Sequence, residues 1–367
     1  MMQQRFNRSA GVLALLMLLG SFSVFAQTNL TQLRVSPHAS VSQTIGFTEI
    51  TIDYHRPAVN NRQVWGGLVP YGMAPGQPFN FNKPFPWRAG ANENTTITFS
   101  TDVTVNGAQI PAGKYGLHML PVENGEWTII FNKDNASWGS FFYDEKQDQA
   151  RVKTKPVSAP FSEWLYYGFE NLSQNSAVGY LHWAELKVPF TVEIDLHETV
   201  LASYREQLTN LAGFNWQAWM QAANYCAQNK INQAEGLVWI ENSVARNRDV
   251  RNLAIKAVLL EQTGKSAESK KVEKETLELA KNTDIEADLN TAGYNFLFNN
   301  KTEQAIEIFK LNIKKHPDSW NVYDSLAEAY QQQGNTSESI KLYQKAMAMA
   351  PDGQKNRIQN AINSQMN

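Results

Sequence analysis

The sequence predicts a two-domain protein, with an all-β antiparallel sandwich or small barrel followed by an all-α solenoid. Three observations lead to this prediction. Apolar and polar residues alternate in several segments between residues 30 and 197, as in strands with one buried side. Glycine and proline become rare near residue 198, and Ala, Gln, Glu, Lys and Leu dominate after it. The last part of the chain then repeats itself about every 34 residues.

Composition excludes several classes of protein. The 367 residues suffice for about two domains, and 43% of them are hydrophobic, which predicts a folded chain. A formal net charge of −2 excludes a generic nucleic-acid binder and gives no reason for attraction to an anionic membrane. The single cysteine, Cys226, excludes an internal disulfide framework and any multi-cysteine metal site.

Residues 1–26 are predicted to be a secretory signal peptide. Two arginines precede the apolar run 11–19, which is too short to span a bilayer. The small residues Val24 and Ala26 then predict cleavage before Gln27. No cysteine follows the run, so a lipoprotein anchor is excluded, and an uncleaved membrane anchor is the alternative. We expect export to the periplasm or beyond, with no membrane segment after cleavage.

Strands are expected throughout residues 27–197, the predicted β domain. Alternation is clearest in residues 48–56, 95–105 and 186–196. Asn106-Gly107 and Asn124-Gly125 lie between such runs, and both residues of an Asn-Gly pair accept the positive φ angles of a type I′ turn. The sequence therefore predicts two tight hairpins.

A connecting helix is expected over residues 198–213, and helical repeats over 214–367. Two units are clear, 286–319 and 320–353, and two degenerate units precede them. Similar residues recur 34 positions apart: Leu289, Ala292, Gly293, Phe296, Ala305, Phe309 and Pro317 in one unit, and Tyr323, Leu326, Ala327, Tyr330, Ser339, Tyr343 and Pro351 in the next. The pattern resembles the tetratricopeptide repeat (TPR), in which small and large residues interlock two antiparallel helices. Unrelated amphipathic helices are the alternative, more so for the first two units.

The β domain carries five sequence motifs in a specific order. They are SPHASVSQTIGFTEITIDYHRPAVNNR from Ser36, LVPYG from Leu68, WRAGANENTTITFSTDV from Trp87, PAGKYGLHMLP from Pro111 and EWTIIFNKDNASWGSFFYDE from Glu126. Over about residues 33–197 they resemble the exported bacterial family called domain of unknown function 2911, whose members often carry C-terminal TPRs. That family has no established activity, so the resemblance implies an architecture without a mechanism. Residues 73–86 are longer than the usual link in the family, which leaves the shape of the adjacent loop open.

Polar side chains at strand ends are the candidate ligand-binding group of the β domain. They are Arg56, Arg88, Asn92, Glu93, Lys133 and Trp138. If these strand ends adjoin, three cations and one anion favour a small polar, anionic or hydroxyl-rich ligand, and the tryptophan offers a stacking surface. In the alternative, the ends lie at opposite poles, Arg88 and Glu93 form a structural ion pair, and the tryptophans belong to the core.

Other chemistries have weak support in the sequence. The β domain holds His38, His55, His118 and His182, with Asp53 near His55, but it has no HExxH, His-x-His or cysteine pair. There is no G-x-S-x-G, Walker or GxGxxG motif. We therefore expect no metal and no cofactor.

The repeats offer a second candidate surface. Polar residues on the first helix of each repeat are expected to face a groove that takes a protein or peptide: Asn295, Asn299, Lys301, Asp324 and Gln331. The alternatives are an ordinary solvated helix surface, or repeats that only support the β domain.

These observations lead to two functional hypotheses. The first is a non-enzymatic binding or scaffold protein of the bacterial envelope, with a ligand-binding β domain and a protein-interaction repeat domain. The alternative is a periplasmic hydrolase of peptide or sugar material that uses the loop of Arg88 and Glu93 with His55 or His118.

Overall fold

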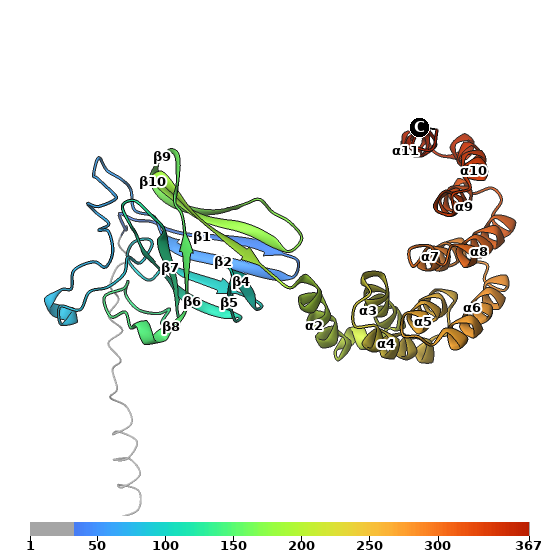
Figure 1. Cartoon of the computed structure of the whole chain (residues 1–367), viewed down its shortest axis with the longest axis horizontal. Coiled ribbons are helices and arrows are strands. Elements are labelled where there is room, and N and C mark those ends of the chain that lie inside the picture. The colour runs from blue at the N-terminus through green and yellow to red at the C-terminus, as the bar shows by residue number, and fades with distance from the viewer. Residues whose placement is uncertain (1–32, 367) are drawn as a thin grey trace, which may run out of the picture. The chain divides into compact units, whose positions relative to one another are not determined.

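A computed structural model describes residues 33–366, and the expected signal peptide at 1–26 lies outside these residues. The chain divides into two compact units (Figure 1). The first takes in the chain up to Gln43, then Glu49–Leu172 and Ser176–Glu193; the second comprises Thr44–Thr48, Ser173–Asn175 and Ile194–Asn367. Among the helices described in residues 33–366, none has the length and apolarity needed to cross a membrane.

The described strands of the first unit form two antiparallel sheets, which confirms the predicted sandwich-like β domain. One sheet has six strands in the order β1-β2-β3-β6-β7-β8, and the other has four in the order β5-β4-β10-β9. The strands are β1 His38–Ile45, β2 Thr48–His55, β3 Thr96–Phe99, β4 Val103–Val105, β5 Ala108–Ile110, β6 Gly113–Leu120, β7 Trp127–Asn132, β8 Asp148–Thr154, β9 Val157–Glu170 and β10 Ser176–Glu193.

Alternation in the sequence marks the buried face of each sheet. In β2, Ile50 and Ile52 are fully buried, while Asp53 stays partly exposed on the other face. The alternating run 95–105 is not one strand, however. It pairs within the six-stranded sheet as β3 and then crosses to the four-stranded sheet as β4. Because Phe99 and Val103 are both buried, the pattern does not reveal that the chain changes sheets between them.

The two predicted Asn-Gly turns have different outcomes. Asn106 and Gly107 have φ angles of 45° and 85°, and they join β4 to β5 as a type I′ turn requires. The hairpin predicted at Asn124 and Gly125 also forms, because β6 pairs antiparallel with β7, but its type I′ turn is wrong, since neither residue has a positive φ. That connection is instead organised around Trp127, whose indole nitrogen donates a hydrogen bond to the Val122 carbonyl at 3.0 Å.

Four tryptophans hold the long β2–β3 connection against the sheets. Trp127 comes from the six-stranded sheet and Trp183 from the four-stranded sheet, and both are almost fully buried. Trp65 in the connection packs edge-on against both, at ring-centroid distances of 4.9 and 5.8 Å, and against Trp87 at 5.6 Å. Such aromatic pairs contribute about 0.5–1.5 kcal/mol each beyond area burial. The connection is therefore part of the core rather than a loose loop.

The second unit begins with a helix that is shorter than the sequence suggested. The expected connecting helix over 198–213 is α2, Leu196–Leu208, followed by a short 3-10 segment, Leu211–Phe214. Asp195 caps its N-terminus by accepting a hydrogen bond from the Glu198 amide at 3.0 Å. Its end is fixed by Gly213, because a β-carbon there would overlap the Leu208 carbonyl where the chain turns back.

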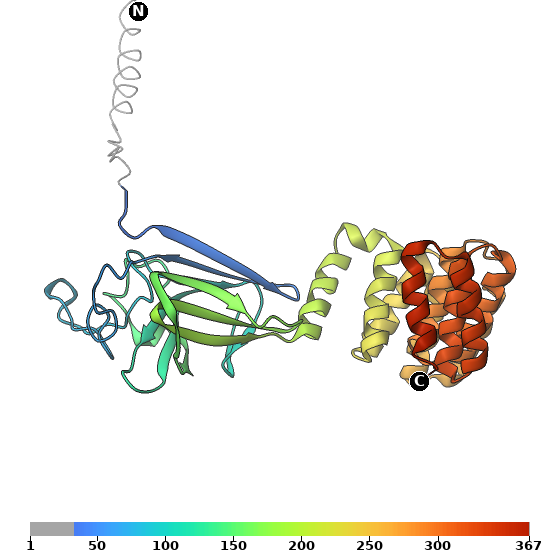
Figure 2. The same ribbon diagram turned by 90° about the horizontal axis from the view of Figure 1, so that it is seen from above.

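Nine further described helices follow as antiparallel pairs and a last single helix. They are α3 Trp216–Asn229, α4 Gln233–Arg246, α5 Val250–Gln262, α6 Ser266–Lys281, α7 Glu286–Leu297, α8 Thr302–Lys315, α9 Trp320–Gln333, α10 Thr336–Met349 and α11 Asp352–Asn363. The helices of this unit follow one another around an arc (Figure 1), and Figure 2 shows the last of them lying side by side. This arrangement confirms the predicted helical repeat.

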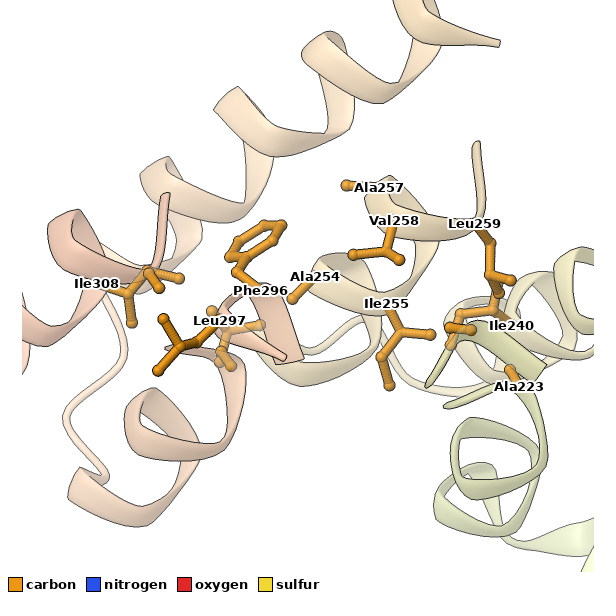
Figure 3. Packing of buried hydrophobic residues seen from close by; sticks show 14 of the residues in the cluster. Ala223, Ile240, Ala254, Ile255, Ala257, Val258, Leu259, Phe296, Leu297 and Ile308 are labelled. Carbon is orange, nitrogen blue, oxygen red and sulfur yellow. The ribbon is translucent and has the colours of Figure 1, made fainter. Parts of the chain in front are cut away.

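Contacts between neighbouring repeats reproduce the period seen in the sequence. The Tyr294 hydroxyl donates to Glu328 at 2.7 Å, and the Ser325 hydroxyl donates to Asn290 at 2.7 Å. These partners are 34 and 35 residues apart. One apolar core extends from α2 to α9, and in it residues of α5 pack between those of α4 and α7 (Figure 3).

Small residues let the helices of a pair approach closely. A β-carbon at Gly236 of α4 would lie 2.7 Å from Cβ of Cys226 in α3, a buried residue with a free thiol. In the next pairs, Gly293 of α7 faces the fully buried Phe309 of α8. The equivalent position in α9 is Ala327, which is also buried.

Candidate functional site

Strand register brings the predicted strand ends together. Thr96 at the start of β3 pairs with Gly116, and Gly116 pairs with Asn132 at the end of β7. The loops beyond these ends are joined by Asn94, whose amide N–H donates to the Ser137 carbonyl at 3.2 Å and whose side-chain nitrogen donates to the Asp134 carbonyl at 3.3 Å. The two ends therefore adjoin, as the site hypothesis required.

The β2–β3 connection forms the larger hollow, with a volume of about 720 Å³. Its walls are mostly apolar, and the principal wall residues are Leu68, Val69, Phe85, Trp87, Phe141 and Trp183. Residues 73–86, the segment expected to be longer than the family's usual link, contribute to these walls, and a bridge pairs Ala74 with Phe85. Arg62, Arg88 and Asn92 supply polar groups. This lining suits a ligand with an apolar body and a polar end.

Arg88 is the half-buried cation of the larger hollow. Its guanidinium carbon lies 4.8 Å from the centre of the Phe141 ring, and its Nη1 donates to the Asn92 carbonyl. Gly139, with a φ of 65°, lies against the guanidinium so closely that a β-carbon would overlap it. Burial lowers the pKa of Arg88, and within residues 33–366 no carboxylate forms an ion pair with it. The loop thus holds a cation beside a hollow without a negative partner.

Backbone conformation shapes the loop that carries Arg88. Ala89 and Asn92 both have positive φ, at 51° and 58°. The Ala89 carbonyl accepts a hydrogen bond from the Tyr167 hydroxyl at 2.8 Å, and the Asn92 side chain donates to the Ser36 carbonyl at 3.1 Å. A left-handed alanine costs about 1–2 kcal/mol, which these tertiary contacts offset.

Glu93 faces a different space, the smaller hollow, of about 460 Å³. Its Oε1 accepts a hydrogen bond from Arg34 at 2.6 Å, and its Oε2 lies 3.4 Å from Nε2 of His55. His38 Nε2 lies 3.7 Å from Oδ1 of Asp53 in the same hollow. The Arg34 hydrogen bond lowers the pKa of Glu93, and burial lowers the pKa of His55. Glu93 is therefore ionised and His55 neutral at neutral pH.

The other buried histidines have structural roles. His118 Nδ1 lies 2.9 Å from the Ser140 hydroxyl, and burial lowers its pKa to about 4. His182 lies between the Tyr166 hydroxyl, at 2.7 Å, and the Pro160 carbonyl, at 2.8 Å. In the described part of the chain, no group of three or more His, Cys, Asp or Glu residues could hold a metal ion.

The structure distributes the predicted ligand-binding residues over two hollows and the outer surface. Arg88 and Asn92 line the larger hollow, and Glu93 lines the smaller one. In the part of the chain that the structure describes, Arg56 and Lys133 line neither hollow. The Arg56 side chain donates to the Leu165 carbonyl at 2.9 Å, and Lys133 is exposed. Trp138 is 54% exposed, with the Arg34 guanidinium 5.7 Å from its ring centre.

Sequence reasoning missed several residues of the smaller hollow or beside it. They are Arg34, Asn94, Lys114 and Ser137. Two of them could have been found from their place in the sequence, since Asn94 directly follows Glu93 and Ser137 directly precedes Trp138.

In the repeats, the predicted groove residues mostly contact other helices. Asn295 is buried and donates to the Arg251 carbonyl at 3.1 Å, and Asp324 is buried and accepts from Arg357 at 2.7 Å. Lys301 pairs with the buried Glu273 at 2.5 Å. These three therefore have little or no free surface.

The other two predicted groove residues keep more accessible side chains. Asn299 is half-buried and donates to the Asn295 carbonyl at 2.8 Å. Gln331 is exposed and accepts a hydrogen bond from the Tyr343 hydroxyl at 3.1 Å.

Fold and hollows together define a two-domain protein: a sandwich-like β domain with one mostly apolar and one polar hollow, followed by a helical repeat. Comparison with known families identifies the first domain. Residues 36–192 match the family described as "Protein of unknown function (DUF2911)", so the chain contains a DUF2911 domain.

Solved TPR proteins resemble the chain at low identity. YrrB, described as a TPR protein with an unusual peptide-binding site, is 16% identical, with 42% of this chain and 78% of that chain covered and a TM-score of 0.26. TTC0263 of Thermus thermophilus is 16% identical, with coverages of 47% and 91% and a TM-score of 0.33. MamA from Desulfovibrio magneticus RS-1 is 16% identical, with coverages of 41% and 82% and a TM-score of 0.28. No curated protein matches the chain.

Proposed function

We propose that this protein is an exported binding protein of the bacterial envelope. Its β domain binds a small anionic ligand in the larger hollow, and its repeats bind a protein or peptide. The observation that carries the proposal is Arg88, a half-buried guanidinium that lines the hollow without a carboxylate partner among the described residues.

The lining of the larger hollow favours an anion with an apolar or aromatic body. A carboxylate or phosphate would form charge-assisted hydrogen bonds with Arg88, each worth about 1.5–3 kcal/mol. Trp87 and Phe141 add apolar surface for the rest of the ligand, and a volume of about 720 Å³ suits a small organic molecule.

The proposal for the repeats rests on architecture. Stacked helix pairs typically present an extended surface for a partner segment. Asn299 and Gln331 are the predicted groove residues with accessible side chains, so they are the ones proposed to contact the partner.

The hydrolase alternative gains no support from the pair of His55 and Glu93. A carboxylate whose pKa is lowered by Arg34 is a poor base, and His118 is buried beside Ser140. The contacts that position Glu93 therefore weaken it for proton transfer.

Binding to the larger hollow can be tested with aromatic anions. Benzoate, indole-3-acetate and phenyl phosphate would be titrated into the full-length protein by calorimetry. We expect at least one to bind, Arg88→Gln to weaken that binding at least tenfold, and Arg88→Lys to weaken it less. Lys133→Gln, which removes an exposed cation outside both hollows, is the matched control and should bind normally. Equal binding by wild type and Arg88→Gln, or no binding of any probe, would refute the proposed ligand class.

Export has its own test. N-terminal sequencing of the mature protein from a bacterial culture should begin at Gln27, the residue after the expected cleavage site. A mature protein that begins at Met1 would refute the proposed cleavage.

A further inference from the structure

The smaller hollow has a buried polar floor. His55, Asn94 and Thr96 line it, and each is at most 9% exposed. The side-chain oxygen of Asn94 is buried and has no hydrogen-bond partner among residues 33–366. Buried polar atoms are almost always hydrogen-bonded, so an unpartnered acceptor in the wall of a hollow points to a ligand that donates to it.

The orientation of the Asn94 amide is fixed by its surroundings. Its nitrogen donates to the Asp134 carbonyl at 3.3 Å, and a flipped amide would place oxygen against oxygen there. Gly116 allows this approach, because a β-carbon on it would lie 2.5 Å from the Asp134 carbonyl oxygen. The unpartnered atom is therefore the oxygen.

Charges around the smaller hollow are balanced. Asp53 and Glu93 are the acidic residues of its lining and Lys114 is the basic one, while Arg34 pairs with Glu93 beside it. His55 is neutral because burial lowers its pKa. A strongly charged ligand would gain little net attraction here, in contrast to the larger hollow, where Arg88 has no carboxylate partner within the described part of the chain.

Both acceptors and a donor of hydrogen bonds line the smaller hollow. Asp53, Glu93 and the Asn94 oxygen accept hydrogen bonds, and Lys114 donates them. The Ser137 hydroxyl donates to Asp134, which leaves its own lone pairs as acceptors. A ligand with several hydroxyl groups matches this lining, because each hydroxyl both donates and accepts.

An exposed aromatic side chain stands beside these groups. Trp138 directly follows Ser137 of the lining and is 54% exposed. Arg34, which holds Glu93, also lies 5.7 Å from the centre of the Trp138 ring. The C–H face of a sugar ring stacks on such an indole while its hydroxyl groups reach polar neighbours.

We propose that the smaller hollow is a binding site for a sugar unit of a glycan. The Asn94 oxygen, Asp53 and Glu93 accept hydrogen bonds from the sugar hydroxyl groups, and Trp138 stacks on the ring. The loop that carries Ser137 and Trp138 is already ordered, since Asn135 donates to the Lys114 carbonyl at 2.9 Å and Asp134 accepts from Ser137. Preorganisation of this kind lowers the entropy lost on binding.

This proposal does not rest on the anion site. The residues that carry it belong to the smaller hollow, and those that carry the anion proposal belong to the larger one. Binding of the aromatic anions and binding of a glycan are measured separately, so either proposal can fail alone.

The experiment is a glycan array probed with the full-length protein, followed by calorimetry with the best-bound oligosaccharide. We expect dissociation constants in the micromolar to millimolar range, typical of small polar ligands. Trp138→Ala changes an exposed side chain, so it should keep the fold and weaken binding at least tenfold. Asn94→Leu removes the unpartnered oxygen and should also weaken binding at least tenfold. Lys133→Gln is the control and should bind like wild type.

Three results would overturn the proposal. The first is the absence of binding to any glycan. The second is a Trp138→Ala variant that folds normally by circular dichroism and binds as tightly as wild type. The third is loss of sugar binding on addition of a chelator, which would place an ion against Asp53 and Glu93 instead of sugar hydroxyl groups.

Discussion

The close approach of α7 and α8 makes Gly293→Ala a sensitive test of the repeat packing. The new β-carbon would lie 2.6 Å from Cζ and 2.7 Å from Cδ1 of Phe309, which is fully buried and cannot swing into solvent. Overpacking of this kind costs about 1–3 kcal/mol. Alanine returns about 0.5–1 kcal/mol through its higher helix propensity. We therefore expect a net loss of about 1 kcal/mol in the free energy of unfolding.

Gly353→Ala is the matched control, because a β-carbon at Gly353 in α11 meets no atom of residues 33–366 within 4 Å beyond the helix's own backbone. Only the propensity gain remains there, so this variant should be as stable as wild type or more stable, by up to about 1 kcal/mol. Both variants would be unfolded with urea, with the loss of helix followed by far-UV circular dichroism.

A double-mutant cycle tests the cause. In a Phe309→Leu background the ring is gone, so Gly293→Ala should lose most of its cost and can become stabilising. The reasoning is refuted if Gly293→Ala stabilises the wild-type chain, or if its cost is the same with Phe309 and with Leu at that position.

Three further predictions concern other parts of the chain. In thermal melts, Gly107→Ala should lower the free energy of unfolding by about 1–2 kcal/mol, because Gly107 has a φ of 85°; the cost comes from this backbone angle, since the space around Gly107 is open. Gly125→Ala, at an Asn-Gly pair without positive φ, should leave stability nearly unchanged in the same melts. His118 has a folded pKa of about 4, against about 6.5 when unfolded, so the unfolded state binds the proton more readily. The free energy of unfolding is therefore unaffected by His118 above about pH 6.5 and falls by about 3 kcal/mol as the pH is lowered to 4. Urea midpoints of His118→Gln should vary less over that pH range than those of wild type. Parallel pH profiles of the two proteins would contradict this prediction. Lys301→Met should lower the free energy of unfolding by about 3 kcal/mol, because it leaves the Glu273 carboxylate buried without its cation. Adding Glu273→Gln should recover part of the loss. An unchanged urea midpoint for Lys301→Met would contradict the prediction.

Most of the fold could be predicted because its signals are local. Alternation marks the buried face of β2, and the 34-residue period corresponds to hydrogen bonds between neighbouring repeats, such as that between Tyr294 and Glu328. The crossing from β3 to β4 could not be predicted, because both strands bury their apolar residues in one core and alternate in the same way. Likewise, an Asn-Gly pair signals a tight turn only where no neighbour such as Trp127 organises the connection instead.

The candidate site was only partly predictable for a related reason. Arg88, Asn92 and Glu93 could be located because they precede a strand. Their division between two hollows depends on partners that are distant in sequence, such as Arg34, which lies 59 residues from Glu93. Such pairings follow from the strand order β1-β2-β3, which no local pattern encodes.

The buried Cys226 thiol is a chemical probe of how often the surrounding repeats open. Burial raises the pKa of the Cys226 thiol to about 11, so at pH 7 only about one molecule in ten thousand carries the reactive thiolate. The Cys226 side chain is also fully buried against α4, where a β-carbon on Gly236 would lie 3.4 Å from its sulfur. Modification by a thiol reagent in native buffer therefore has to wait until α3 and α4 separate. The labelling rate thus measures how often this helix pair opens, by local or by global unfolding.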